Sequence, residues 1–238
     1  MDAKISASRR EVGSQARTVL VAGGLLAAFA LVAQAGAHLA NYAFLDMGIS
    51  HLDADLDGNA LTWASSLATL CAAAFALMLA RLLPARRRLL TVLGVLLAFF
   101  AADDAFGIHE NLGSVFARVG LPDVAGIWFP VYLPLFGFCA AVLWTLGSPE
   151  RRVVTIVRLG VLLLGAAIVG EALTAVVPAL ERTDATWLYE LEVALEEAAE
   201  LAGWIAIATG LGSEDMIARH AVHPDEAAAF ESPSASAV

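Results

Sequence analysis

Apolar residues occupy six long stretches of this chain, each near the roughly 20 residues that a helix needs to cross a bilayer. The stretches are residues 18–40, 59–83, 89–109, 125–147, 153–178 and 187–212. The pattern predicts an all-α fold, a polytopic transmembrane bundle of six helices that forms one domain over residues 18–212. We expect a cytoplasmic N-terminal segment at 1–17 and a flexible, polar cytoplasmic tail at 213–238.

Composition supports this class. The 238 residues are 59% hydrophobic and only 16% charged, and the mean hydropathy is +0.74, well above the apolar share of a soluble domain. The lipid bilayer is therefore the expected partner. The formal net charge of −10 argues against a nucleic-acid partner, because nucleic-acid binding needs a basic surface.

The basic residues indicate how the bundle is oriented. Twelve of the fourteen Lys and Arg residues fall on one side of the predicted bundle, and only Arg118 and Arg182 fall on the other. The side rich in basic residues includes both termini, and basic loops stay in the cytoplasm. The sequence therefore predicts a multi-pass protein of the cell membrane with both its N-terminus and its C-terminus in the cytoplasm.

The first apolar stretch has a second interpretation. A basic start, an apolar run and the sequence Ala33-Gln34-Ala35 also match a secretory signal peptide with its cleavage site. The apolar character continues to Leu45, which is long for a signal. We expect a retained helix, and cleavage, which would leave five helices, stays an alternative.

The last apolar stretch carries the least usual chemistry. Five glutamates interrupt residues 187–212: Glu190, Glu192, Glu196, Glu197 and Glu200. At about 100° per residue they gather on one side of a helix. Because a carboxylate in hydrocarbon is costly, this side should face a protein interior or a wet cavity, and it marks a functional site by default.

Other polar side chains reach a similar depth. Asp103, Asp104, His109 and Glu110 lie at the outer end of the third stretch, and Glu171 lies in the fifth. At 1.5 Å per residue, Asp103, Asp104, Glu196 and Glu197 come out about 22 Å from the cytoplasmic helix ends. We expect one acidic site in the outer half of the bundle, with His38 and Glu192 at its periphery.

The pattern Asp103-Asp104-x4-His109-Glu110, then Glu171, then Glu196-Glu197-x-x-Glu200 resembles a recurring pattern in small bacterial polytopic membrane proteins of unassigned function. The resemblance spans the last four predicted helices. It implies that these positions act as one unit, in a bacterial inner membrane, and it implies no particular activity.

Such a cluster needs protons or cations, since crowded carboxylates cannot all ionise in a low dielectric. The first hypothesis is a divalent metal (zinc, manganese or iron) that supports hydrolysis at the outer membrane face. Its candidate ligands are Asp103, Asp104, His109, Glu110, Glu171, Glu196, Glu197 and Glu200. A proton- or cation-coupled transporter of small solutes and a structural network of protonated acids are the alternatives.

The first outer connection has its own candidate site. Asp53, Asp55, Asp57 and Gly58 match the start of a calcium-binding loop. The glutamate expected at the twelfth position is replaced by Ala64. An acidic turn, in which Asp57 or Asn59 caps the second helix, is therefore the favoured interpretation, with calcium as the alternative.

Overall fold

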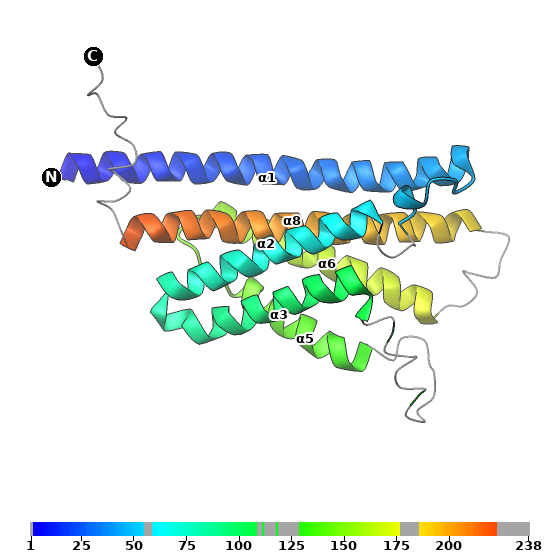
Figure 1. Cartoon of the computed structure of the whole chain (residues 1–238). Helices are drawn as coiled ribbons and strands as arrows, with labels where there is room; N and C mark the ends of the chain where they lie inside the picture. Colours follow the sequence, from blue (N-terminus) through cyan, green and yellow to red (C-terminus); the bar gives the residue numbers. More distant parts are fainter. Residues whose placement is uncertain are drawn as a thin grey trace, which may run out of the picture.

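Six α-helices and no strand occur in the described part of the computed structural model of the chain, which confirms the predicted all-α class (Figure 1). The described residues are 2–54, 59–108, 111, 118, 129–176 and 186–222. The α-helices are α1 (Asp2–Leu45), α2 (Ala60–Leu82), α3 (Arg87–Phe106), α5 (Phe129–Trp144), α6 (Arg151–Val176) and α8 (Thr186–Val222). Two short 3-10 helices, η1 (Ser50–Leu52) and η2 (Pro84–Arg86), precede α2 and α3.

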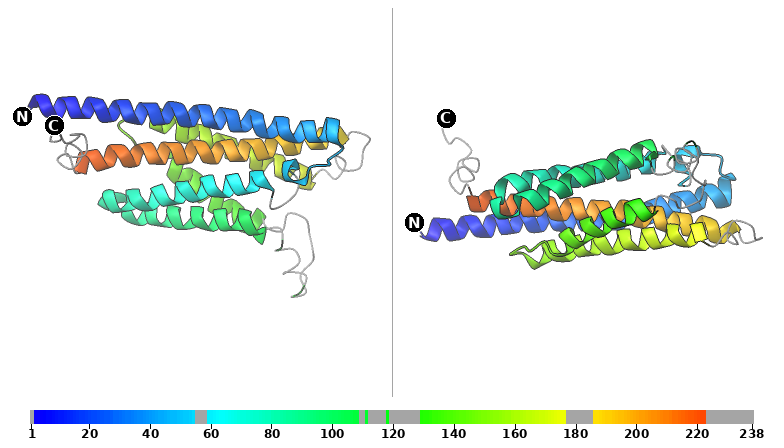
Figure 2. Two further views of the ribbon diagram at one scale, coloured as in Figure 1. Left: turned by 45° about the horizontal axis from the view of Figure 1, so that its top comes forward. Right: turned by 90° about the horizontal axis from the view of Figure 1, so that it is seen from below.

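Helix α8 lies at the centre of the bundle. It packs against α1, α2 and α6, whereas α3 packs mainly on α2, and α5 lies against α3 and α6 (Figures 1 and 2). Helices α1 and α8 run antiparallel along most of their length, so the start of α1 and the end of α8 lie at the same end of the molecule. The most acidic helix is thus also the most enclosed one.

The described helices fit a membrane protein. Four helical stretches are long and apolar enough to cross a bilayer: Gly13–Leu45, Thr62–Leu82, Pro84–Phe106 and Arg151–Ala172. Helix α5 is apolar but shorter, and α8 is interrupted by its acids. Large apolar side chains such as Leu25, Phe29 and Val32 are more than half exposed, as expected for side chains that face lipid rather than water.

A single stripe of α1 faces the bundle. Its buried residues recur at the three- and four-residue spacing of one helix face, and they are Ala16, Leu20, Ala27, Ala30, Gln34, His38 and Asn41. The N-terminal part of the stripe, Ala16 to Ala30, is apolar, and the C-terminal part, Gln34 to Asn41, is polar. Gln34, which belongs to the signal-like Ala-Gln-Ala sequence, is therefore buried within a continuous helix that packs on α8.

Specific caps set the helix ends near the outer side. The Asn59 side chain accepts a hydrogen bond from the Thr62 N–H at 2.9 Å, which caps the start of α2 as one of the two predicted capping residues. Helix α3 ends at Gly107, which adopts a left-handed conformation with φ of 56° and donates its N–H to the Asp103 carbonyl. This cap places Asp103 and Asp104 in the last turn of α3.

Helix α8 continues to Val222 instead of ending near residue 212, so residues 213–222 are helical and do not belong to a flexible tail. The reason is burial: Ser213, Glu214 and Asp215 are all buried, and Asp215 pairs with Arg219 one turn later at 2.6 Å. Burial also raises the pKa of Glu214, although Ser148 and Arg86 act in the opposite direction. The expected tail residues 223–238 lie outside the described part.

Close contact between α6 and α8 depends on glycine. A Cβ atom at Gly160 would lie 2.7 Å from the Gly203 carbonyl oxygen and 2.7 Å from Ile207. At Gly165, one and a half turns along the same helix, a Cβ atom would meet nothing within 4 Å. The two helices therefore approach each other at Gly160 in a way that permits no side chain.

We expect Gly160→Ala to lower the free energy of unfolding by about 1–3 kcal/mol, because the added methyl group must push two backbones apart. Gly165→Ala is the matched control and should be neutral or slightly stabilising, since alanine favours a helix. Thermal unfolding of both variants in detergent provides the comparison. Equal melting temperatures would show that α6 and α8 do not pack as described.

Candidate functional site

A cavity of about 70 Å³ lies among α3, α5, α6 and α8. That volume holds a few water molecules or one small cation. The lining residues come from all four helices and are Phe100, Asp103, Asp104, Tyr132, Phe136, Leu164, Ala167, Ile168, Glu171, Glu196, Glu200 and Trp204. We call this the acidic cavity, because carboxyl groups form most of its polar surface.

Three helices supply the carboxyl groups of the acidic cavity. The last turn of α3 brings Asp103 and Asp104, the outer part of α6 brings Glu171, and α8 brings Glu196 and Glu200 from positions one turn apart. Five of the acids that were predicted to lie at a similar depth in the bundle thus line one cavity. None of the described lining residues is Lys, Arg or His.

Neutral donors hold three of these acids. Tyr132 donates its hydroxyl to Asp103 at 2.8 Å, and Ser66 donates to Asp104 at 2.7 Å. Glu200 accepts from both the Ser65 hydroxyl and the Trp204 indole N–H, each at 3.1 Å. Such bonds orient a carboxylate without neutralising its charge. These hydrogen bonds by themselves leave the charge of the three carboxylates in place.

The remaining acids face each other. Glu196 lies within electrostatic reach of Glu171, Glu192 and Glu197. Both Glu192 carboxylate oxygens are buried, and one lies so close to Gly170 that a Cβ atom there would come within 2.8 Å. Because a carboxylate only accepts hydrogen bonds, neighbouring carboxyl groups bond to each other only when one of them holds a proton.

His38 belongs to a separate cluster near the C-terminal end of α1. Its Nε2 atom lies 2.9 Å from the Glu190 carboxylate, and its Nδ1 atom accepts the Ala54 N–H at 3.0 Å. This bond fixes the neutral ring with its proton on Nε2, which then donates to Glu190. The Asp53 carboxylate is 3.9 Å from Nδ1. The cluster ties α1 and the first outer connection to α8, and it does not line the acidic cavity.

The structure therefore divides the predicted site residues. Five of the candidate metal ligands line the acidic cavity, whereas Glu192 and Glu197 lie beside it on α8. His109, Glu110, Asp55 and Asp57 lie outside the described residues. In the part of the chain that the structure describes, no three His, Cys, Asp or Glu side chains come close enough to hold a metal ion.

Sequence reasoning did not identify the hydroxyl donors. Ser65, Ser66 and Tyr132 lie in apolar stretches, where a hydroxyl is common and carries little signal. The adjacent pair of serines, level with the acids and in the outer half of the second stretch, was the available hint. The proximity of Trp204 to the site could be inferred from sequence, because Trp204 lies one helical turn from Glu200.

A family model described as a domain of unknown function (DUF8692) matches residues 19–213. The chain belongs to this family. All the described residues of the acidic cavity lie within the matched region, in agreement with the resemblance to a family without an assigned activity. No curated protein and no solved structure matches the chain. The bacterial origin and the acidic sequence pattern stay predictions.

We expect Tyr132→Phe to lower the free energy of unfolding by about 1–3 kcal/mol, since the buried Asp103 carboxyl loses a donor. The same change at Tyr42 on α1, away from the acidic cavity, is the control and should have a smaller effect. Chemical unfolding in detergent measures both. A Tyr132→Phe protein as stable as the wild type would mean that this hydrogen bond is not formed.

Proposed function

We propose that this integral membrane protein binds a cation in the acidic cavity in exchange for protons, as the binding step of proton-coupled transport. One observation carries the proposal. Five carboxyl groups from three helices share a small cavity, and the described residues around it include no basic side chain. Intramembrane chains of acidic residues are typical of proton and cation pathways.

Electrostatic repulsion between the carboxylates links the binding of a cation to the binding of protons. Carboxylates a few ångströms apart in a low dielectric repel strongly, so only some of them stay ionised unless a positive charge enters. Glu196 is central, because Glu171, Glu192 and Glu197 all act on it. A cation that enters favours ionised carboxylates and releases protons, and a proton that enters favours release of the cation. Exchange of the two is a direct consequence of this arrangement.

The geometry favours an exchangeable cation over a tightly held one. A divalent ion needs several oxygen atoms converging on one point at about 2.0–2.6 Å. Here Asp103, Asp104 and Glu200 are instead held apart by hydrogen bonds to different neighbours. Aromatic and aliphatic side chains supply the other walls, and Phe100 and Phe136 stack with centroids 4.2 Å apart. Carboxylates beside aromatic rings suit a small organic cation.

Helix α5 provides the wall that can open. It is the shortest of the apolar helices, and Pro134 within it cannot donate the usual hydrogen bond to the carbonyl four residues earlier. Tyr132 and Phe136, on either side of this proline, close the acidic cavity from α5. A bend at Pro134 would therefore move both side chains and change access to the carboxyl groups.

Divalent metal binding stays the second candidate. Zinc, manganese or iron for hydrolysis at the outer face would require ligands beyond the described cluster, and the candidates His109 and Glu110 directly follow the end of α3 in sequence. Calcium at Asp53, Asp55 and Asp57 likewise stays a prediction, with Asp53 lying near His38.

Proton release on cation addition tests the proposal. Weakly buffered protein in detergent is titrated with tetramethylammonium, and separately with sodium, while a pH electrode records released protons. We expect release from the wild type and at least about tenfold weaker binding in Glu196→Gln, equivalent to about 1.4 kcal/mol. Glu150→Gln, the same change outside the acidic cavity, should behave as the wild type.

Other outcomes identify the alternatives. A stoichiometric transition metal in freshly purified protein, lost in Glu196→Gln/Glu200→Gln, would replace the proposal with the metal hypothesis. The absence of proton release and of any bound metal, together with a lower melting temperature for Glu196→Gln, would leave a structural role for the acids. Proton release that is identical in Glu196→Gln and in the wild type would place cation binding elsewhere.

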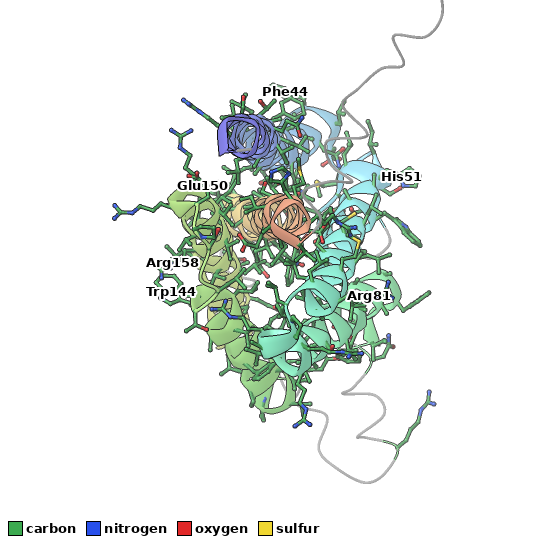
Figure 3. All side chains as sticks on the ribbon, turned by 90° about the vertical axis from the view of Figure 1, so that its left-hand side faces the viewer. Phe44, His51, Arg81, Trp144, Glu150 and Arg158 are labelled. Carbon is green, nitrogen blue, oxygen red and sulfur yellow. The ribbon has the colours of Figure 1, made fainter. Side chains whose placement is uncertain are left out.

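We also propose that both termini are cytoplasmic. Arg86 contacts the Gly147 carbonyl, and Arg219 contacts Met78, so basic residues from η2 and α8 lie at the end of the bundle where α1 begins. Figure 3 shows this end, with Arg81 and Arg158 labelled. Arg158 lies over the Trp144 ring at 5.1 Å, as a cationic side chain does when it reaches for a membrane surface.

Reporter fusions test this orientation. A fluorescent protein fused after residue 238 should fluoresce, and an alkaline phosphatase at the same position should be inactive, because each needs a different side of the membrane. A phosphatase fused after Arg118, in an outer connection, should be active and serves as the control. The reverse pattern at both positions would invert the proposed topology.

A further inference from the structure

A second, basic groove lies at the end of the bundle opposite the outer side, between α1 and the start of α6. Gly13, Ser14 and Arg17 line it from α1, and Glu150 and Arg152 line it from α6 and the residue before it. Figure 3 looks onto this end and labels Glu150 beside the α1 ribbon. We call it the α1–α6 groove. It is separate from the acidic cavity and shares no lining residue with it.

The charge of the α1–α6 groove favours an anion. Among the described lining residues, Arg17 and Arg152 bring exposed guanidinium groups from two different helices, and Glu150 brings a single carboxylate. The Glu150 carboxylate accepts the Arg152 backbone N–H at 3.3 Å, so it caps the first turn of α6. Guanidinium groups bind phosphate oxygens through paired hydrogen bonds, which makes arginine the preferred residue for phosphate recognition.

The position of the groove matches a headgroup layer. A long apolar run begins just after Arg17 on α1 and just after Arg152 on α6. Just beyond the arginines the two helices come together, since a Cβ atom at Gly24 would lie 3.8 Å from Ile156. The groove therefore lies where two helices leave the aqueous phase, and it closes where the hydrocarbon begins.

Apolar side chains continue from the groove along the same faces. Val21 and Leu25 follow Arg17 at a spacing of four residues, and both are more than half exposed. On α6, Leu159 follows Arg152 by seven residues and is also about half exposed. Two cationic groups at one end of an exposed apolar track have the shape and polarity of a phospholipid with a negative headgroup.

We propose that the α1–α6 groove binds the phosphate headgroup of an anionic phospholipid, with its acyl chains along the exposed apolar faces of α1 and α6. Basic pockets between transmembrane helices on the cytoplasmic side are suited to such headgroups. The apolar track distinguishes a lipid from free phosphate, which would gain nothing from Val21, Leu25 or Leu159. The bound lipid would hold α1 against α6 at the end of the bundle remote from the acidic cavity.

Native mass spectrometry of detergent-solubilised protein tests this site, with equal amounts of phosphatidylglycerol and phosphatidylcholine added. We expect the wild type to retain phosphatidylglycerol in preference to phosphatidylcholine. In Arg17→Gln/Arg152→Gln, the ratio of retained phosphatidylglycerol to retained phosphatidylcholine should fall at least about tenfold. Arg87→Gln/Arg88→Gln, at the exposed start of α3, changes the net charge equally and should keep the preference. Glu150→Gln removes the acid among the described residues that line the groove and should increase retention.

Three results would overturn the proposal. Equal loss in the two arginine pairs would indicate a general attraction of lipid to positive charge, and equal retention of both lipids would exclude headgroup recognition. Displacement of phosphatidylglycerol by millimolar inorganic phosphate would indicate a soluble anion as the ligand. If Arg17→Gln/Arg152→Gln fails to fold, the comparison of Glu150→Gln with the wild type decides, and unchanged retention would reject the site.

Discussion

Carboxyl groups on a membrane-embedded helix must be enclosed by protein, and the arrangement of this bundle follows from that constraint. Helix α8 has α1, α2 and α6 around it, and α1 and α2 form hydrogen bonds with its acids. His38 of α1 bonds to Glu190, and the serines of α2 donate to the acids on their side. The remaining helices, α3 and α5, complete the enclosure rather than adding an independent core.

The two sides of α8 differ in how far their polar groups are satisfied. Toward α1, an imidazole meets the Glu190 carboxylate directly and leaves no space between the helices. Toward α3, α5 and α6, Asp103, Asp104 and Glu200 accept hydrogen bonds from neutral donors, and the acids surround a cavity. A closed contact stabilises the fold, whereas an open one keeps its charge available. The second side is therefore where we propose that a cation binds.

The helices were predictable from sequence because apolar runs of membrane length leave few alternatives. The shared depth of Asp103, Asp104, Glu171 and Glu196 also followed from helix geometry alone. The hydrogen-bond partners of the acids could not be predicted. Whether Tyr132, Ser65 or His38 reaches an acid depends on how each helix is rotated and on which helices are neighbours, and a single sequence shows neither. The extension of α8 beyond residue 212 was not predicted, because the polar residues there suggest a solvent-exposed tail. In the structure Ser213, Glu214 and Asp215 are buried within the helix.

The central position of α8 also bears on how the protein is made. During synthesis, the helix that the others surround is the last to leave the ribosome, after α1, α2, α3, α5 and α6. Its acids make it a poor candidate for partition into lipid by itself. Membrane insertion of α8 would then depend on the earlier helices, which enclose its acids.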